Sequence, residues 1–189
     1  MRHFVLVALS LVLVTGCAHL EVPSQEAYPF RAEFTAHGTV KGAGLNMKGA
    51  ILLTSAESGV IQTYGPGGVA TGSIGITENA LVMRDLWGRE TGSMDLPLRG
   101  VIGLVAGDLP RGAYLYKIST GCGLKVVYHW GSISITDDLL PRGLHVSGDK
   151  ELDVDFIPKG RDIDLVVRHG SDTVWISLLV SQGGRWFTP

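Results

Sequence analysis

An alternation of apolar and polar residues with a period of two runs through most of the chain and restricts its fold more than any other feature. The segment KELDVDF (150–156) places Leu152, Val154 and Phe156 on one side and acidic residues on the other. This period is typical of a strand with one buried face. Similar short segments recur between residues 31 and 180, separated by glycine-rich turns. The pattern predicts an antiparallel meander of about ten or eleven strands, ending with TVWISLLV (173–180) and a polar-aromatic tail.

A sheet of this length has to curl, because the twist between neighbouring strands accumulates. The predicted fold is therefore mainly β, an incomplete antiparallel β-barrel with a concave apolar face. The chain has 189 residues, of which 45% are hydrophobic and 18% charged, which argues against disorder and favours one domain over residues 31–189. A net charge of -2, with no cluster of lysines and arginines, argues against nucleic acid as a partner.

One segment, DLPLRGVIGLVAGDLP (95–110), departs from the period of two. Asp95 is a candidate N-cap, and Gly107 followed by Pro110 provides the signals that end a helix. The apolar residues that share one helical stripe are Leu98, Val101, Ile102 and Val105. The segment predicts one main amphipathic helix of about ten residues, lying on the concave face.

The clearest hairpin is expected between residues 150 and 168, with its turn at Lys159-Gly160. This register pairs Phe156 with Ile163 and sets Asp155 opposite Asp164. The two carboxylates fit either a calcium site or a solvated outer face. Because calcium takes roughly six to eight oxygen ligands, the solvated face is the better interpretation.

The N-terminus is typical of an exported lipoprotein. A short positive start precedes the apolar run FVLVALSLVLV (4–14), which is too short to span a bilayer but fits the core of a signal peptide. The sequence VTGC (14–17) then resembles the bacterial lipoprotein signal, in which the peptide is cut before the cysteine and the cysteine carries lipid. We therefore expect a signal peptide over 1–16, a lipid on Cys17 and a tether over 17–30. An ordinary secretory signal with a free Cys17 is the alternative.

Cys122 is the second of the two cysteines, and lipidation of Cys17 would leave it without a partner. No histidine stands at metal-ligand spacing, and no nucleophile, phosphate-loop or dinucleotide motif is present. The sequence therefore predicts no catalytic residues, no metal and no cofactor apart from the covalent lipid. The candidates for lining an apolar cavity, each also compatible with an ordinary core, are Phe34, Leu53, Trp87, Val101, Ile102, Val105 and Phe156.

Three stretches resemble LolB-like outer-membrane lipoproteins of the LolA/LolB-type lipoprotein-localisation family. These stretches are VIQTYGPGGVATGSIGI (60–76), DLPLRGVIGLVAGDLPRGAYLYKI (95–118) and LKVVYHW…LLPRGLHVSGDKELDVDF (124–156). The resemblance implies a half-barrel whose cavity holds the acyl chains of lipoproteins delivered by a periplasmic LolA-like carrier. It also implies an insertion loop at Pro66, Gly67, Gly68 and Val69. The family has an exposed leucine where this chain has Gly67, so Val69 is the nearest apolar residue.

Together these features predict a lipid-anchored protein that binds acyl chains of lipoproteins or lipids and assists their insertion into the outer membrane, facing the periplasm. The resemblance implies the outer membrane. Ala18 directly after the cysteine implies the same, because in Gram-negative lipoproteins a residue other than aspartate at this position usually accompanies delivery to the outer membrane. A structural or accessory envelope lipoprotein, using the same fold as a protein-interaction module, is the alternative.

Overall fold

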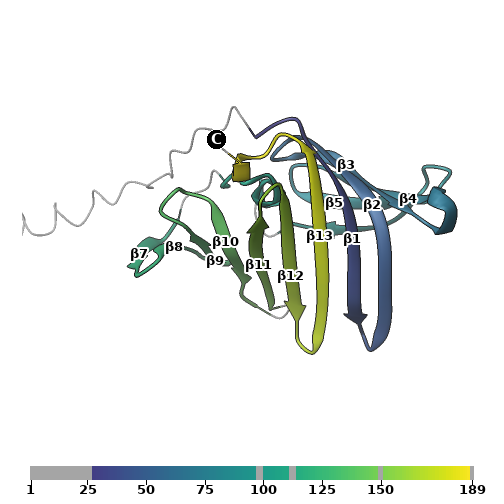
Figure 1. Cartoon of the computed structure of the whole chain (residues 1–189). Helices are drawn as coiled ribbons and strands as arrows, with labels where there is room; N and C mark the ends of the chain where they lie inside the picture. Colours follow the sequence, from purple (N-terminus) through teal and green to yellow (C-terminus); the bar gives the residue numbers. More distant parts are fainter. Residues whose placement is uncertain (1–26, 97–99, 111–113, 149–150, 188–189) are drawn as a thin grey trace, which may run out of the picture.

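One open antiparallel sheet dominates the computed structural model, which describes residues 27–96, 100–110, 114–148 and 151–187 (Figure 1). The thirteen strands of this described part are β1 (Phe30–Val40), β2 (Ala43–Ser55), β3 (Ser58–Tyr64), β4 (Ala70–Ile76), β5 (Ala80–Arg84), β6 (Glu90–Asp95), β7 (Tyr116–Thr120), β8 (Gly123–Tyr128), β9 (Gly131–Ile135), β10 (Pro141–Val146), β11 (Leu152–Lys159), β12 (Asp162–His169) and β13 (Asp172–Gln182). Three short 3-10 helices accompany them: η1 (Pro66–Gly68), η2 (Val101–Ala106) and η3 (Arg185–Phe187).

The sheet is curled around η2 and is not closed into a barrel. Its strand order is β6-β5-β4-β3-β2-β1-β13-β12-β11-β10-β9-β8-β7, so β6 and β7 form two open edges and the first and last strands pair near the centre. Ile76 of β4 and Ile133 of β9 belong to one buried cluster although their strands lie far apart in this order. The two wings of the sheet therefore face each other across η2 (Figure 1). The predicted incomplete β-barrel is confirmed.

The sheet has more strands than the expected ten or eleven, and β6 is one that the sequence pattern missed. Of its residues, ETGSMD, only Met94 is a large apolar one, and Met94 itself is 54% exposed. An edge strand with little buried surface leaves no alternating pattern in the sequence.

The hairpin of β11 and β12 forms as predicted, but its register differs by two residues. Phe156 pairs with Leu165, not with Ile163, and Asp155 lies opposite Val166, not Asp164. The reason is the turn, which uses Gly160 and Arg161 between the paired Lys159 and Asp162, with Gly160 at a φ of 63°. Glycine adopts this backbone conformation without steric cost.

The facing pair of carboxylates is therefore a wrong prediction. Asp155 accepts a hydrogen bond from Arg168, 2.7 Å away, and Asp164 forms an ion pair with Lys159. Each carboxylate is balanced by a cation, as a solvated outer face would favour.

The predicted helix of about ten residues is much shorter in the structure. It is the 3-10 helix η2, whose six residues begin after Gly100, and Gly100 has a left-handed φ of 78° that an α-helix cannot contain. Gly103 also lets the helix approach Ala56 and Tyr28 closely, since an added Cβ would fall 2.9 and 2.7 Å from them. Leu98, part of the expected stripe, lies outside the described residues.

The N-terminal boundary of the domain lies slightly before the predicted one. Ala27 is fully buried, and Phe30, fully buried as well, begins β1 inside the expected tether. The predicted signal peptide, Cys17 and the first part of the predicted tether lie outside the described residues. Within the described part of the chain, none of the helices has the length and apolar character needed to cross a bilayer.

Candidate functional site

The concave side of the sheet carries nearly all of the apolar core. On β1, Phe34 pairs with Leu178 of β13 and with Gly49 of β2, so that these three positions face inward together. Alternation continues this face across the sheet, because every second residue of a strand lies on the same side. Its fully buried members include Phe30, Leu53, Ile163 and Leu178. We call this surface the concave face.

Two short helices fill the concave face at one end of the strands. Leu104 of η2 is almost fully buried among the core residues. Trp186 of η3 donates a hydrogen bond from its indole N–H to the Val105 carbonyl oxygen, 2.8 Å away, and stacks on Phe156 with ring centroids 5.9 Å apart. This end is therefore closed by packed side chains.

The opposite end of the concave face is less covered. Its inward-facing side chains are only half-buried although they are as apolar as those at the filled end; they are Met47, Val167, Val174 and Ile176. The register places them in adjacent positions, since Met47 and Ile176 both pair with Ala36, and Val174 pairs with Val167. We call these four residues the open end. An apolar surface of this kind can accept an apolar chain.

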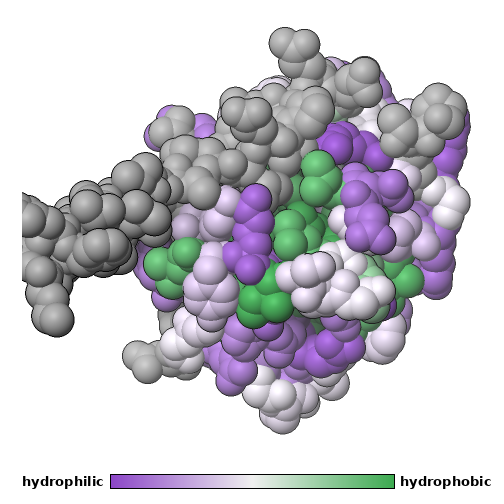
Figure 2. Space-filling view, turned by 90° about the vertical axis from the view of Figure 1, so that its left-hand side faces the viewer, coloured by the Kyte–Doolittle hydropathy of each residue, from purple (hydrophilic) through white to green (hydrophobic). Residues whose placement is uncertain are grey.

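A second half-covered apolar area lies on the wing formed by β3 to β6. There Ile61 pairs with Ile74, which in turn pairs with Met83, so one inward row crosses three strands. Met83 is 42% exposed, and Ile61 and Ile74 are half-buried. Figure 2 shows a different side of the molecule, the one on which β7 lies in Figure 1, where some hydrophobic residues lie among hydrophilic ones.

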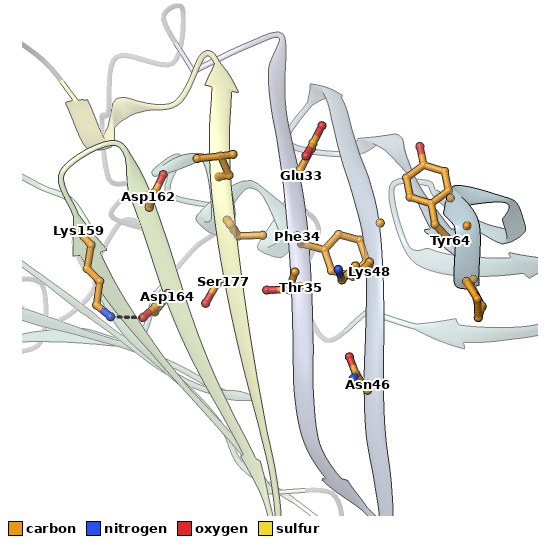
Figure 3. A pocket seen from close by; sticks show the side chains of 17 residues that line it. Glu33, Phe34, Thr35, Asn46, Lys48, Tyr64, Lys159, Asp162, Asp164 and Ser177 are labelled. Atoms are coloured by element: carbon orange, nitrogen blue, oxygen red, sulfur yellow. Dashed lines mark ion pairs between the residues drawn. The ribbon is translucent and has the colours of Figure 1, made fainter.

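The outer face carries a pocket of about 1030 Å³ with a different character (Figure 3). It spreads over β12, β13, β1 and β2 and is flanked by η1, and many of its side chains are polar or charged. The labelled polar or charged ones are Glu33, Thr35, Asn46, Lys48, Tyr64, Lys159, Asp162, Asp164 and Ser177, and Phe34 of the concave face also borders the pocket. An acyl chain in this pocket would have to desolvate these charged side chains, which is unfavourable.

An ion pair orders one wall of this pocket. The hydrogen bond from Lys159 holds the pKa of the Asp164 carboxyl below its usual range, with a further contribution from a Ser177 hydrogen bond, while burial opposes the shift. On the concave side, burial raises the pKa of Tyr128 to about 12, so this phenol stays neutral.

The lowered pKa of Asp164 predicts part of the acid sensitivity of the fold. The ionised carboxylate stabilises the fold above the pKa of an unfolded aspartate, about 3.9, and this contribution is lost as pH falls through the lower folded-state value. Asp164→Asn should therefore give a shallower fall of melting temperature between about pH 5 and pH 2. Circular dichroism melts check this, and Lys159→Gln should flatten the curve in the same direction. Unchanged slopes in both variants would contradict the assignment.

The structure brings together three side chains of types that can bind a metal ion, although their spacing in the sequence does not indicate such a group. His145 Nδ1 lies 2.8 Å from Asp153 Oδ1, and Glu151 completes a set whose ligand atoms all lie within 4.8 Å of one another. Pairing of β10 with β11 brings His145 and Asp153 opposite each other, a register that only the folded sheet provides. All three are partly or fully exposed, and a hydrogen bond between His145 and Asp153 accounts for the contact of these two side chains.

Most of the predicted cavity residues lie on or against the concave face. Phe34, Leu53 and Phe156 are buried in it, Val101 is buried in η2, and Ile102 and Val105 of η2 are half-buried against it. These predicted residues belong to the filled part of the concave face. The half-buried apolar side chains of the open end are not among them.

Trp87 is the exception, and its assignment to the cavity was wrong. It lies in the turn between β5 and β6 with 77% of its surface exposed.

The predicted insertion loop forms η1, in which Gly67 has a φ of 75°, and the adjacent Val69 is 65% exposed.

No protein-family model matches the chain, and no curated protein sequence matches it. Among solved structures, one match is the crystal structure of the LolA superfamily protein NE2245 from Nitrosomonas europaea, with 10% sequence identity and a TM-score of 0.47. The match covers 89% of this chain and 90% of that one.

Proposed function

We propose that this protein is a membrane-anchored lipoprotein whose concave face binds acyl chains of lipoproteins or lipids and assists their insertion into the outer membrane. The observation that carries the proposal is the open end of the concave face, where Met47, Val167, Val174 and Ile176 present half-buried apolar surface inside a curled, unclosed sheet. The resemblance of residues 60–76, 95–118 and 124–156 to LolB-like lipoproteins supports the same function.

The energetics suit temporary binding. Each buried methylene contributes about 0.8 kcal/mol, so a segment of a few methylenes held at the open end gains several kcal/mol. Trp186 and Leu104 close the other end, which limits how much of an acyl chain can enter. A bilayer buries the whole chain and therefore binds it more strongly, which favours release into the membrane. No covalent chemistry and no cofactor takes part.

Location and partners complete the proposal. The lipid on Cys17 would hold the protein on the periplasmic side of the outer membrane. A periplasmic LolA-like carrier would deliver the acylated cargo. Stable anchoring needs two or more acyl chains, which bacterial lipoprotein modification supplies.

A pair of glutamate substitutions on β13 tests acyl-chain binding. Ile176→Glu places a carboxylate at the open end and should weaken binding of a fluorescent fatty-acid probe about tenfold or more, because an unpaired charge in an apolar site costs more than 1.4 kcal/mol. Leu179→Glu is the matched control, since Leu179 is 59% exposed on the outer face of the same strand. Fluorescence titration measures both affinities.

Circular dichroism establishes that each variant is folded. Should Ile176→Glu unfold, Ile176→Trp blocks the same space with apolar volume and should also weaken binding. No probe binding by the wild type, or equal loss in Ile176→Glu and Leu179→Glu, would overturn the proposal.

The packing of the filled end favours a second candidate, a structural or accessory lipoprotein that uses the fold as a protein-interaction module. Phe30, Leu53 and Leu104 are fully or almost fully buried there, and a pocket of about 1030 Å³ lies on the outer face. A wild-type protein that binds no fatty-acid probe and carries no co-purified lipid would support this candidate.

A further inference from the structure

The chain exposes three apolar side chains on two neighbouring loops. Val69, beside η1, is 65% exposed, and the turn between β5 and β6 exposes Leu86 by 57% and Trp87 by 77%. β4 links the two loops, because Val69 precedes its first residue and Ser73 within it pairs with Arg84, the last residue of β5. Both loops therefore lie at the same end of this wing. We call Val69, Leu86 and Trp87 the apolar tip.

The turn that carries Leu86 and Trp87 is tightly built. Asp85 Oδ1 accepts hydrogen bonds from the backbone N–H groups of Trp87 and Arg89, each at 2.9 Å, and Asp85 Oδ2 accepts one from Arg89 Nε at 2.8 Å. These hydrogen bonds lower the pKa of Asp85, against an opposing effect of burial. The guanidinium of Arg89 lies over the Trp87 ring, 5.0 Å from its centroid. The exposure of these side chains is thus fixed by local structure.

Burying an apolar side chain of this size contributes roughly 1.5–3 kcal/mol to stability. Leu86 and Trp87 do not make this contribution, because both are exposed to water. A turn so well organised could equally present polar residues. An exposed apolar group of this kind indicates an interaction surface.

We infer that the apolar tip enters the interface of a lipid bilayer. Two narrow loops offer too little surface for a stable protein partner, which needs about 1,200–2,000 Å² of buried area in total. Insertion into a bilayer requires only that the three side chains of the tip enter the lipid, without an extended interface. Tryptophan is enriched at the level of the headgroups, and Arg84 nearby in the sequence supplies a cation for phosphate.

The tip adjoins the half-covered apolar row on the wing of β3 to β6, which leads to the concave face. Met83 lies one residue before Arg84, faces inward and is 42% exposed. It begins the inward row through Ile74 and Ile61, which ends beside Ile51 next to the core. The inference therefore deepens the proposed function, because it gives an acyl chain a continuous apolar route between bilayer and concave face.

Quenching of tryptophan fluorescence by brominated phospholipids tests the inference. The lipidated protein is reconstituted into vesicles of phosphatidylethanolamine and phosphatidylglycerol with bromine on the upper acyl chain. We expect quenching of wild-type fluorescence and its loss in Trp87→Phe. The matched control is Trp175→Phe, which removes a tryptophan that is 44% exposed on the outer face of β13 and should keep the quenching.

A second variant tests whether apolar contact drives insertion. Leu86→Asp should retain Trp87 and the folded structure but lose the quenching, since a carboxylate next to Trp87 opposes entry into lipid. Absence of quenching in the wild type, or its persistence in Trp87→Phe or Leu86→Asp, overturns the inference. Binding of the fatty-acid probe by the same wild-type protein separates the two proposals, because it depends on the concave face and not on the tip.

Discussion

Replacing Cys17 with serine is expected to move the protein from the membrane fraction to the soluble fraction of the envelope. A single acyl chain binds membranes only marginally, with an association constant of roughly 10⁴ M⁻¹, whereas two or more chains anchor a protein stably. Cys17→Ser removes the attachment point of all of them. The apolar tip adds only three side chains, so it cannot replace the anchor.

Cell fractionation with immunodetection measures the shift, and mass spectrometry of the mature wild type should show the added mass of the lipid on Cys17. Cys122→Ser is the matched control, because Cys122 is a free and exposed cysteine of the folded body. It should remain in the membrane fraction. Retention of Cys17→Ser in the membrane, or wild-type protein with an unmodified Cys17, would contradict lipid anchoring.

The sheet was predictable from the sequence because its signal is local. In β11 the alternation of Leu152, Val154 and Phe156 with acidic residues directly reports which face is buried. The register of the same hairpin was not predictable to the residue. It depends on whether Lys159 or Gly160 takes the first position of the turn, and both choices keep the same apolar side chains inward.

Features that depend on contacts distant in sequence were missed or misplaced. The stripe around Val101 predicted a longer helix, since propensity alone does not show that Gly100 adopts a left-handed conformation. The apolar character of Trp87 predicts a place in the cavity, but it carries no information about the exposed turn in which the residue lies. The tail after residue 180 carried no pattern at all, yet it brings Trp186 into the core through a contact with Val105, 81 positions away in sequence.

Trp186→Ala is expected to be among the most destabilising substitutions in the described part of the chain. Trp186 is only 8% exposed, stacks on Phe156 and donates its indole N–H to the Val105 carbonyl oxygen. Replacing a buried tryptophan with alanine typically lowers the free energy of unfolding by about 3–5 kcal/mol. For a domain of this size, the melting temperature should fall by roughly 10 °C.

Trp186→Phe separates the contribution of the aromatic stacking from that of the hydrogen bond. Phenylalanine keeps an aromatic ring against Phe156 but cannot donate a hydrogen bond to the Val105 carbonyl oxygen. It should lower the free energy of unfolding by about 1–3 kcal/mol, the cost of a buried carbonyl oxygen left without its donor together with a small loss of volume. Urea denaturation followed by circular dichroism measures both variants. If Trp186→Ala unfolds at the wild-type urea concentration, η3 does not close the concave face in solution. The filled end would then be open to acyl chains, and the fatty-acid probe should bind Trp186→Ala and the wild type alike.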